Sequence, residues 1–361
     1  MSGSQQQEDV EYNDEENIKI DADEVAELIS SIQESQYFDA SSMAPLTPAS
    51  MAAIARLRAY KPPPFAVWDR LPLSRRAAVL LLLFADRHGD LRVVITMRAS
   101  TLRNYSGHAA FPGGKADTLE ETPWQTARRE ASEEIGLPVS SASLPHPFRI
   151  EHLCELPYSL ARTALAVRPC VAFLHSDDEN GNKHSDVEEN MIPRLDAKEV
   201  AAVFSAPFHN FLRKEDEVRQ GDPIAGKITD WYKGEWMDWN DSRWRMHSFF
   251  VPVNNQKVTK PRIRPGAIPE HVEKEESDVV ERYKVWGMTA RILVDAARIA
   301  YEEEPNFELN THIGDEPMIA NLERMGKLGE KAAGGSDVTD ADLQRARAQN
   351  QGPASPSDSK I

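Results

Sequence analysis

Residues 111–137 decide the fold, and they read Phe-Pro-Gly-Gly-Lys-Ala-Asp-Thr-Leu-Glu-Glu-Thr-Pro-Trp-Gln-Thr-Ala-Arg-Arg-Glu-Ala-Ser-Glu-Glu-Ile-Gly-Leu. Thr122 suits an N-cap, Pro123 suits the first helical position, and Gln125 completes a capping box. Gly136 fits the residue after the last turn, and Pro138 prevents the helix from continuing. The local chemistry therefore predicts a helix over residues 123–135.

The predicted helix has two different faces. Apolar residues recur at spacings of three and four and predict a packed face: Trp124, Ala127, Ala131 and Ile135. Glu130, Glu133 and Glu134 stand at i, i+3 and i+4, so they gather on another face. Three neighbouring carboxylates repel one another unless a cation lies among them.

Carboxylate oxygens suit Mg²⁺ or Mn²⁺, which also bind substrate phosphates. Arg129 is placed to neutralise and orient the glutamates, and Gly113 and Gly114 let a backbone approach a phosphate before the helix begins. The alternative is a solvated helix face held by salt bridges, which a lone Glu-x-x-Glu-Glu would favour. The coincidence of the glycine loop, the Arg-Glu pair and the terminal glycine favours a metal site.

Apolar runs on both sides of this stretch predict strands. We expect a strand over 77–85, a turn at His88-Gly89-Asp90, and a second strand over 91–97 that forms a hairpin with the first. Further segments with strand or helix patterns are residues 148–156, 163–175 and 244–253 for strands, and 47–60 and 288–301 for helices. Strands and helices mixed in this order indicate an α+β domain with a mixed sheet.

Charge and polarity suggest the domain limits. Residues 1–35 hold eleven acidic side chains and one lysine, so most of the formal net charge of −16 lies there. A segment so charged and so poor in aromatic residues is typical of disorder. We expect an acidic disordered tail over 1–45, a folded domain over 46–302, and a mostly disordered tail over 303–361. Polar stretches at about 177–197 and 214–240 are expected as insertions, and the tryptophans at 231–244 as a packed cover.

Composition also excludes several classes of protein. The net negative charge disfavours nucleic-acid binding. The longest apolar run, residues 77–85, is far shorter than the roughly 20 residues that span a membrane, so we expect no membrane partner. Cys154 and Cys170 form no Cys-x-x-Cys pair, which argues for buried free thiols and against a structural zinc site.

The segment 115–137 resembles the Nudix box, G-x5-E-x7-R-E-U-x-E-E-x-G-U, where U is apolar. The residues in register are Glu121, Arg129, Glu130, Ala131, Glu133, Glu134, Gly136 and Leu137. The leading glycine is replaced by Lys115, with Gly114 one residue early. Upstream, Thr96, Arg98, Leu102, Arg103, Gly107 and Phe111-Pro-Gly-Gly114 resemble the coenzyme A diphosphatase branch, in which a basic residue follows that motif.

The resemblance implies an α/β/α sandwich and a hydrolase that acts on the diphosphate of coenzyme A or acyl-CoA. It implies Glu130, Glu134 and Glu133 as ligands of Mg²⁺ or Mn²⁺. Glu133, Arg129 and Glu121 are the expected catalytic residues, Glu133 being either a further ligand or the base. The expected substrate-binding residues are Arg98, Arg103, Gly113, Gly114 and Lys115.

Two other functions remain open. The first is a Nudix hydrolase of ADP-ribose, dinucleotides or oxidised nucleotides. The second is a Nudix domain that only binds its ligand, which would require the loss of box glutamates, and none is lost here.

The last three residues, Ser359-Lys360-Ile361, are close to the Ser-Lys-Leu address of peroxisomal proteins. Because the resemblance is to fungal peroxisomal enzymes, we expect a peroxisomal protein recognised by an import receptor. The cytoplasm is the alternative location.

Overall fold

The computed structural model describes residues 46–98, 108–176, 191, 200–217, 227–239, 242–253, 258, 282–310, 312–330 and 338–349. The expectations for residues 1–45, for Arg103, for most of 177–197 and for Ser359-Lys360-Ile361 lie outside these ranges. No helix within the described ranges is long and apolar enough to cross a membrane.

A mixed sheet forms the centre of the molecule. Its main path is β3 (Ala109–Ala110), β2 (Leu91–Arg98), β1 (Arg76–Ala85), β7 (Ala166–Ser176) and β5 (Phe148–Glu155). Off this path, β4 (Gly113–Lys115) pairs with β1, β6 (Ser159–Leu160) with β7, and β8 (Val200–Pro207) with β2. The predicted β1–β2 hairpin is antiparallel, with Leu83 opposite Val93, whereas β1 and β7 run parallel. The predicted α+β class is confirmed.

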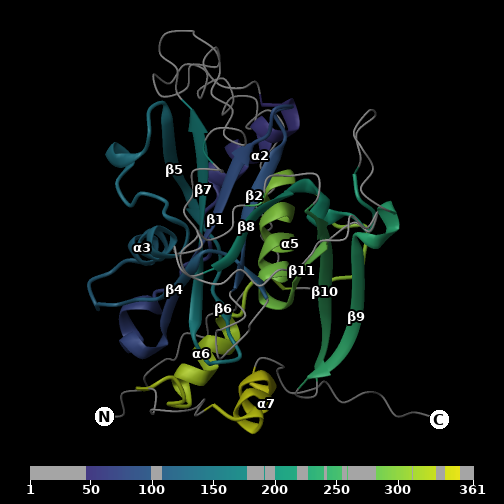
Figure 1. Cartoon of the computed structure of the whole chain (residues 1–361). Helices are drawn as coiled ribbons and strands as arrows, with labels where there is room; N and C mark the ends of the chain where they lie inside the picture. The colour runs from purple at the N-terminus through teal and green to yellow at the C-terminus, as the bar shows by residue number, and fades with distance from the viewer. Residues whose placement is uncertain are drawn as a thin grey trace, which may run out of the picture.

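Strand β1 is the most apolar segment because both of its faces are covered. Leu80, Leu82 and Phe84 belong to one core, and Leu81 and Leu83 to the other. Helix α3 (Pro123–Ile135) covers the first face, and α2 (Pro48–Ala59) and α5 (Gly287–Tyr301) cover the second, as Figure 1 shows. The sheet thus lies between two helical layers.

A second sheet packs beyond α5 (Figure 1). It is antiparallel and contains β9 (Tyr232–Trp239), β10 (Ser242–Pro252) and β11 (Arg282–Trp286). The polar stretch 214–240, expected as an insertion, therefore supplies a strand. Trp231 is fully buried, and its ring centroid lies 5.6 Å from those of both Phe211 and Phe249. The packed role expected for the tryptophans at 231–244 therefore holds for Trp231, but not for Trp236 on β9, which is 38% exposed and donates to Glu308 at 2.7 Å.

The expectation that residues 303–361 are mostly disordered is wrong for the described part of this segment. Helices α6 (Glu316–Arg324) and α7 (Asp340–Ala348) are formed, and they bury Ile319, Leu322, Leu343 and Ala346 in the same core as α3. The Asn321 side chain donates to the Ala346 main-chain oxygen at 2.6 Å and joins the two helices. Each helix has only nine residues and few apolar positions. In the sequence such a short segment looks like a polar tail, which is why the two helices were not predicted.

Candidate active site

Helix α3 begins and ends where its local sequence requires. The Thr122 hydroxyl accepts from the Gln125 N–H and the Gln125 side chain accepts from the Thr122 N–H, which completes the predicted capping box. Gly136 ends the helix in the left-handed conformation, with φ of 70°. The predicted apolar face is confirmed: Ala127, Ala131 and Ile135 are fully buried, and the half-buried Trp124 packs against the same core. The glutamates are consequently fixed on the remaining surface of the helix.

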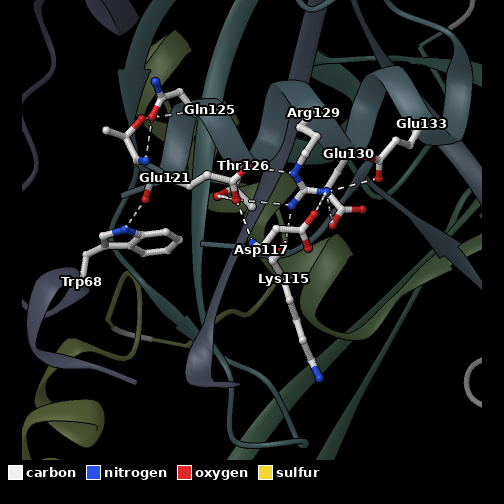
Figure 2. A network of polar contacts seen from close by, with 10 residues as sticks. Trp68, Lys115, Asp117, Glu121, Gln125, Thr126, Arg129, Glu130 and Glu133 are labelled. Atoms are coloured by element: carbon white, nitrogen blue, oxygen red, sulfur yellow. Dashed lines mark hydrogen bonds and ion pairs between the residues drawn. The ribbon is translucent and has the colours of Figure 1, made fainter. Parts of the chain in front are cut away.

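Arg129 is the hub of a carboxylate cluster (Figure 2). Its Nε donates to Glu121 at 2.8 Å, and its Nη1 lies 3.2 Å from both Glu130 and Glu133. Its Nη2 donates to the main-chain oxygen of Lys115 at 2.7 Å. The Asp117 carboxylate lies 3.5 Å from Arg129 Nη1. One guanidinium therefore faces four carboxylates.

Glu121 is held from several sides. In addition to Arg129, its carboxylate accepts from the Asp117 N–H at 2.8 Å and from the Thr126 hydroxyl at 3.2 Å. Burial alone would raise the pKa of Glu121, but these hydrogen bonds outweigh burial and the net pKa lies below its ordinary value. Because the Glu121 carboxylate is ionised and held by these hydrogen bonds, it fixes the orientation of Arg129.

Glu130 and Glu134 lie against the glycine loop. The buried Glu134 carboxylate accepts from the Gly113 N–H at 3.1 Å. A Cβ at Gly114 would stand only 2.5 Å from the Glu130 carboxylate. Burial raises the pKa of Glu130, which the charge of Glu133 reinforces and Arg129 opposes. The two glycines thus let the loop backbone touch both carboxylates.

The donor set fits a hard divalent cation. Every donor is an oxygen, and the acidic charge exceeds that of the single arginine. The Glu133 side chain is 50% exposed and reaches solvent. Within the described residues, the oxygens of these glutamates do not converge to within 4.8 Å as a group of three, and Arg129 contacts Glu121, Glu130 and Glu133 at once. A cation here would replace part of the role that Arg129 plays.

The predicted substrate-binding residues are distributed less tightly. Lys115 contributes its main-chain oxygen to the cluster, whereas its side chain extends away from the carboxylates (Figure 2). Arg98 ends β2, with its N–H bonded to the His108 oxygen at 3.0 Å. Its Nε is buried without a hydrogen-bond partner among the described residues.

Sequence reasoning missed Trp68 and Thr126 as supporting residues, and it named Asp117 only as part of the family motif and not for its contact with Glu121. Asp117 and Thr126 donate to Glu121, and the Trp68 indole N–H donates to the Glu121 main-chain oxygen at 2.8 Å. Trp68 precedes the box by some fifty residues, so only the fold brings it to this position. Asp117 and Thr126 lie within the quoted stretch, four and five residues from Glu121. This short spacing could have indicated that their N–H and hydroxyl groups reach the Glu121 carboxylate.

Known proteins are similar to the chain across this region. A model of the NUDIX domain matches residues 74–231. Peroxisomal coenzyme A diphosphatase 1 of Saccharomyces cerevisiae is 32% identical over 272 residues, which cover 71% of this chain and 77% of that protein. A peroxisomal coenzyme A diphosphatase of Mus musculus is 27% identical over 70% of this chain and 80% of that protein. The mitochondrial Nudix hydrolase 15 of Arabidopsis thaliana is 31% identical over 64% of this chain and 61% of that protein.

Proposed function

The chain belongs to the Nudix hydrolase family, and from that premise we propose that it hydrolyses the diphosphate bond of coenzyme A and its acyl derivatives. The products would be 4′-phosphopantetheine, or its acyl form, and adenosine 3′,5′-bisphosphate. The main support is the cluster of box carboxylates around Arg129, formed by Glu121, Glu130 and Glu133, in a chain that matches two proteins named coenzyme A diphosphatase over about 70% of its length.

Mg²⁺ or Mn²⁺ is the proposed cofactor, and Glu130, Glu134 and Glu133 would hold it. Glu130 and Glu134 lie one turn apart on α3 and both reach the glycine loop. When bound, such a cation supplies Lewis-acid stabilisation of the charge that develops on the diphosphate. Because Glu133 faces solvent, a cation bound there could keep some of its water ligands, so the free-energy cost of dehydrating it would be moderate.

The protein side chains divide the remaining work. Glu133 is the proposed base, since it is the most exposed box glutamate in contact with Arg129, and it would take the proton of the attacking water. Glu121 would act as a positioning residue, because its carboxylate oxygens already accept hydrogen bonds from Arg129, Asp117 and Thr126. Arg129 would orient Glu121 and Glu133, to which it donates at 2.8 and 3.2 Å.

The phosphates of the substrate are assigned to the loop side of the cluster. A side chain at Gly114 would fill the space against the Glu130 carboxylate, so its absence would leave room there for a cation and the diphosphate that it binds. Arg98 offers a guanidinium whose Nε has no partner in the described ranges, so it is a proposed phosphate ligand together with Arg103. Lys115 would act from the outer side of the loop.

The test compares three substrates in the presence of Mg²⁺: coenzyme A, its form without the 3′-phosphate, and ADP-ribose. We expect adenosine 3′,5′-bisphosphate from coenzyme A as the preferred reaction, identified by chromatography, and its loss in Glu134→Gln. Glutamine can still accept from the Gly113 N–H, so the variant tests the charge and not the fold. Cleavage of ADP-ribose without cleavage of coenzyme A would contradict the proposed substrate.

We assign the protein to peroxisomes through Ser359-Lys360-Ile361, which an import receptor would recognise. Both coenzyme A diphosphatases reported above carry the word peroxisomal in their names. A fluorescent protein fused to the N-terminus should report punctate peroxisomal signal, and removal of the three residues should disperse it. Cytoplasmic signal from the intact fusion would contradict the assignment.

A further inference from the structure

A β-bulge in β5 places two polar side chains on the same face of the sheet. His152 lies opposite Ala172 of β7 and Cys154 lies opposite Val171, so Leu153 is the extra residue between them. Residues three apart on a regular strand face opposite sides. The bulge corrects this, so that His152 and Glu155 both face the side where Cys170 of β7 is buried.

The three side chains bring metal-ligating atoms together. The imidazole nitrogen of His152, a carboxylate oxygen of Glu155 and the Cys170 sulfur all lie within 4.8 Å of one another. In a tetrahedral zinc site each ligand atom lies about 2.0–2.3 Å from the ion, so two ligand atoms are somewhat closer to each other than 4.8 Å. A small contraction would therefore let the three groups share one ion.

Neighbouring groups hold two of the ligands in place. Arg168 donates to one oxygen of Glu155 at 2.8 Å and leaves the other oxygen available. The Trp124 ring of α3 stacks on His152, with 4.1 Å between centroids and 10° between planes. Hydrogen bonds and packing contacts to the ligating side chains orient those side chains in metal sites.

The charge around the cluster favours a cation. Arg168 pairs with Glu155 and, at 3.5 Å, with Glu316, so two carboxylates face one guanidinium. The Cys170 thiol makes a weak contact of 4.0 Å with the Arg168 main-chain oxygen. On metal binding this thiol would lose its proton to solvent and become a thiolate, which adds a second negative charge.

Solvent can reach the cluster from two directions. His152 is an exposed residue, although Cys170 is fully buried. Glu155 and Arg168 also line an open pocket of about 300 Å³ together with Trp68, Glu121 and Tyr158. An ion therefore has a route to the ligands without unfolding of the sheet.

We propose that His152, Glu155 and Cys170 form a binding site for a zinc-class divalent cation, separate from the glutamates of α3. The site uses a single cysteine with a histidine and a glutamate, so it does not need the Cys-x-x-Cys pair whose absence argued against a structural zinc site. Thiolate and imidazole ligands select a borderline-soft ion such as Zn²⁺ over Mg²⁺. Three protein ligands leave the fourth tetrahedral position open to water. Through the Trp124–His152 stack, the ion would fasten β5 and β7 to the helix that holds the box glutamates.

Co²⁺ tests this site because thiolate ligation gives a strong charge-transfer absorption that oxygen ligands do not give. Metal-free protein is titrated with Co²⁺ in excess Mg²⁺, which occupies oxygen-only sites. We expect the charge-transfer band to saturate at one Co²⁺ per chain and to disappear when Zn²⁺ is added. We also expect Zn²⁺ to raise the melting temperature.

The chain offers a matched control because it has two cysteines, Cys154 and Cys170, on adjacent strands and both buried. Cys154→Ser should keep the band, and Cys170→Ser should abolish it. Cys154 packs in the other core, so its sulfur cannot reach the site. If wild type gives no band, or if Cys154→Ser removes it and Cys170→Ser does not, the proposal is wrong.

His152→Ala guards against a folding defect in Cys170→Ser, because His152 is exposed. Loss of a residue that only orients a metal ligand costs roughly 10–100-fold in metal affinity. Loss of the ligand itself should therefore weaken Co²⁺ binding by at least about 100-fold. Unchanged Co²⁺ affinity in His152→Ala would overturn the assignment of this ligand. None of these readouts depends on the substrate of the enzyme.

Discussion

Two arginine–carboxylate clusters in the same molecule differ in charge balance and exposure. On α3, Arg129 faces four carboxylates, and the side chains of Glu133 and Asp117 are 50% and 66% exposed. On α5, Arg291 forms a two-pronged pair with Asp315 at 2.9 and 2.5 Å, and both side chains are about 10% exposed. Asp295 beside them lies 3.8 Å from Arg298.

This difference in charge balance and exposure supports the α3 cluster as the proposed functional site and the α5 cluster as a structural one. The α5 cluster has as many arginines as aspartates and is closed to solvent, and Asp315 also accepts from the Leu160 N–H at 2.8 Å, so it fixes the segment before α6 to β6. The α3 cluster has an excess of negative charge and remains open to solvent, so a cation from solution can complete it. Charge balance and exposure distinguish the two clusters better than residue type does.

The largest expected effect is on activity at the α3 cluster. Glu130→Gln should lower kcat/KM for coenzyme A by about 10³-fold, because several kcal/mol of charge stabilisation depend on the metal. The free energy of unfolding should stay the same or rise, since one of several repelling charges is removed. Steady-state kinetics and urea unfolding measure the two quantities. Glu120→Gln, at an exposed loop position, is the control and should remain active. A loss below tenfold in Glu130→Gln would remove Glu130 from the metal site.

The next effect is on stability and distinguishes the two arginines. Arg291→Met leaves Asp315 buried without its partner, which should cost about 3–5 kcal/mol of unfolding free energy. Arg129→Met leaves two carboxylates that solvent can reach, Glu133 and Asp117, and two that are only 16–17% exposed, Glu121 and Glu130. It should therefore cost less than Arg291→Met, about 1–3 kcal/mol. Urea midpoints of the two variants provide the measurement. Equal losses would show that the α3 cluster is also structural.

The adjacent glycines provide a finer comparison. Gly113 has φ of 154°, and a Cβ there would stand 2.5 Å from the Ala78 main-chain oxygen, so Gly113→Ala should cost about 1–3 kcal/mol of stability. At Gly114 the Cβ would meet the end of the flexible Glu130 side chain, which can move aside. Gly114→Ala should therefore stay folded and lose about 10²-fold in activity, because a catalytic group is displaced. Thermal melts and kinetics of both variants test this, and full activity in Gly114→Ala would contradict the placement of Glu130.

The smallest effect concerns pH at the α5 cluster. Burial raises the pKa of Asp295 to about 7, despite the opposing charges of Arg291 and Arg298, and Asp315 adds to the rise. The folded state then holds a proton that the unfolded state has lost, so stability falls as pH rises between the unfolded pKa near 4 and about 7. From pH 6 to 7 the loss should be at most about 1.4 kcal/mol. Urea unfolding at both pH values measures it, and Asp295→Asn should lack this component. An identical slope in the variant would refute the role of Asp295.

Local chemistry made α3 predictable. The capping box of Thr122 and Gln125 and the left-handed Gly136 act within a few residues, so the bounds 123–135 follow from neighbours in the chain. The apolar run of β1 was equally clear because both of its faces are buried. Helices α6 and α7 were missed because their few apolar residues are buried by partners that are distant in sequence, such as β6.

The sequence by itself determined the helix that carries the box glutamates, the grouping of those glutamates on its surface, the central hairpin and the family, because these depend on spacing along one segment. Only the tertiary structure decided which groups hold the cluster in place: the Gly113 N–H donates to Glu134, the Trp68 indole donates to the Glu121 main-chain oxygen, and the Lys115 main-chain oxygen accepts from Arg129. The same holds for His152, Glu155 and Cys170, since a bulge and a pairing register place them together. Contacts of this kind arise from strand pairing and packing, which spacing in the chain does not encode.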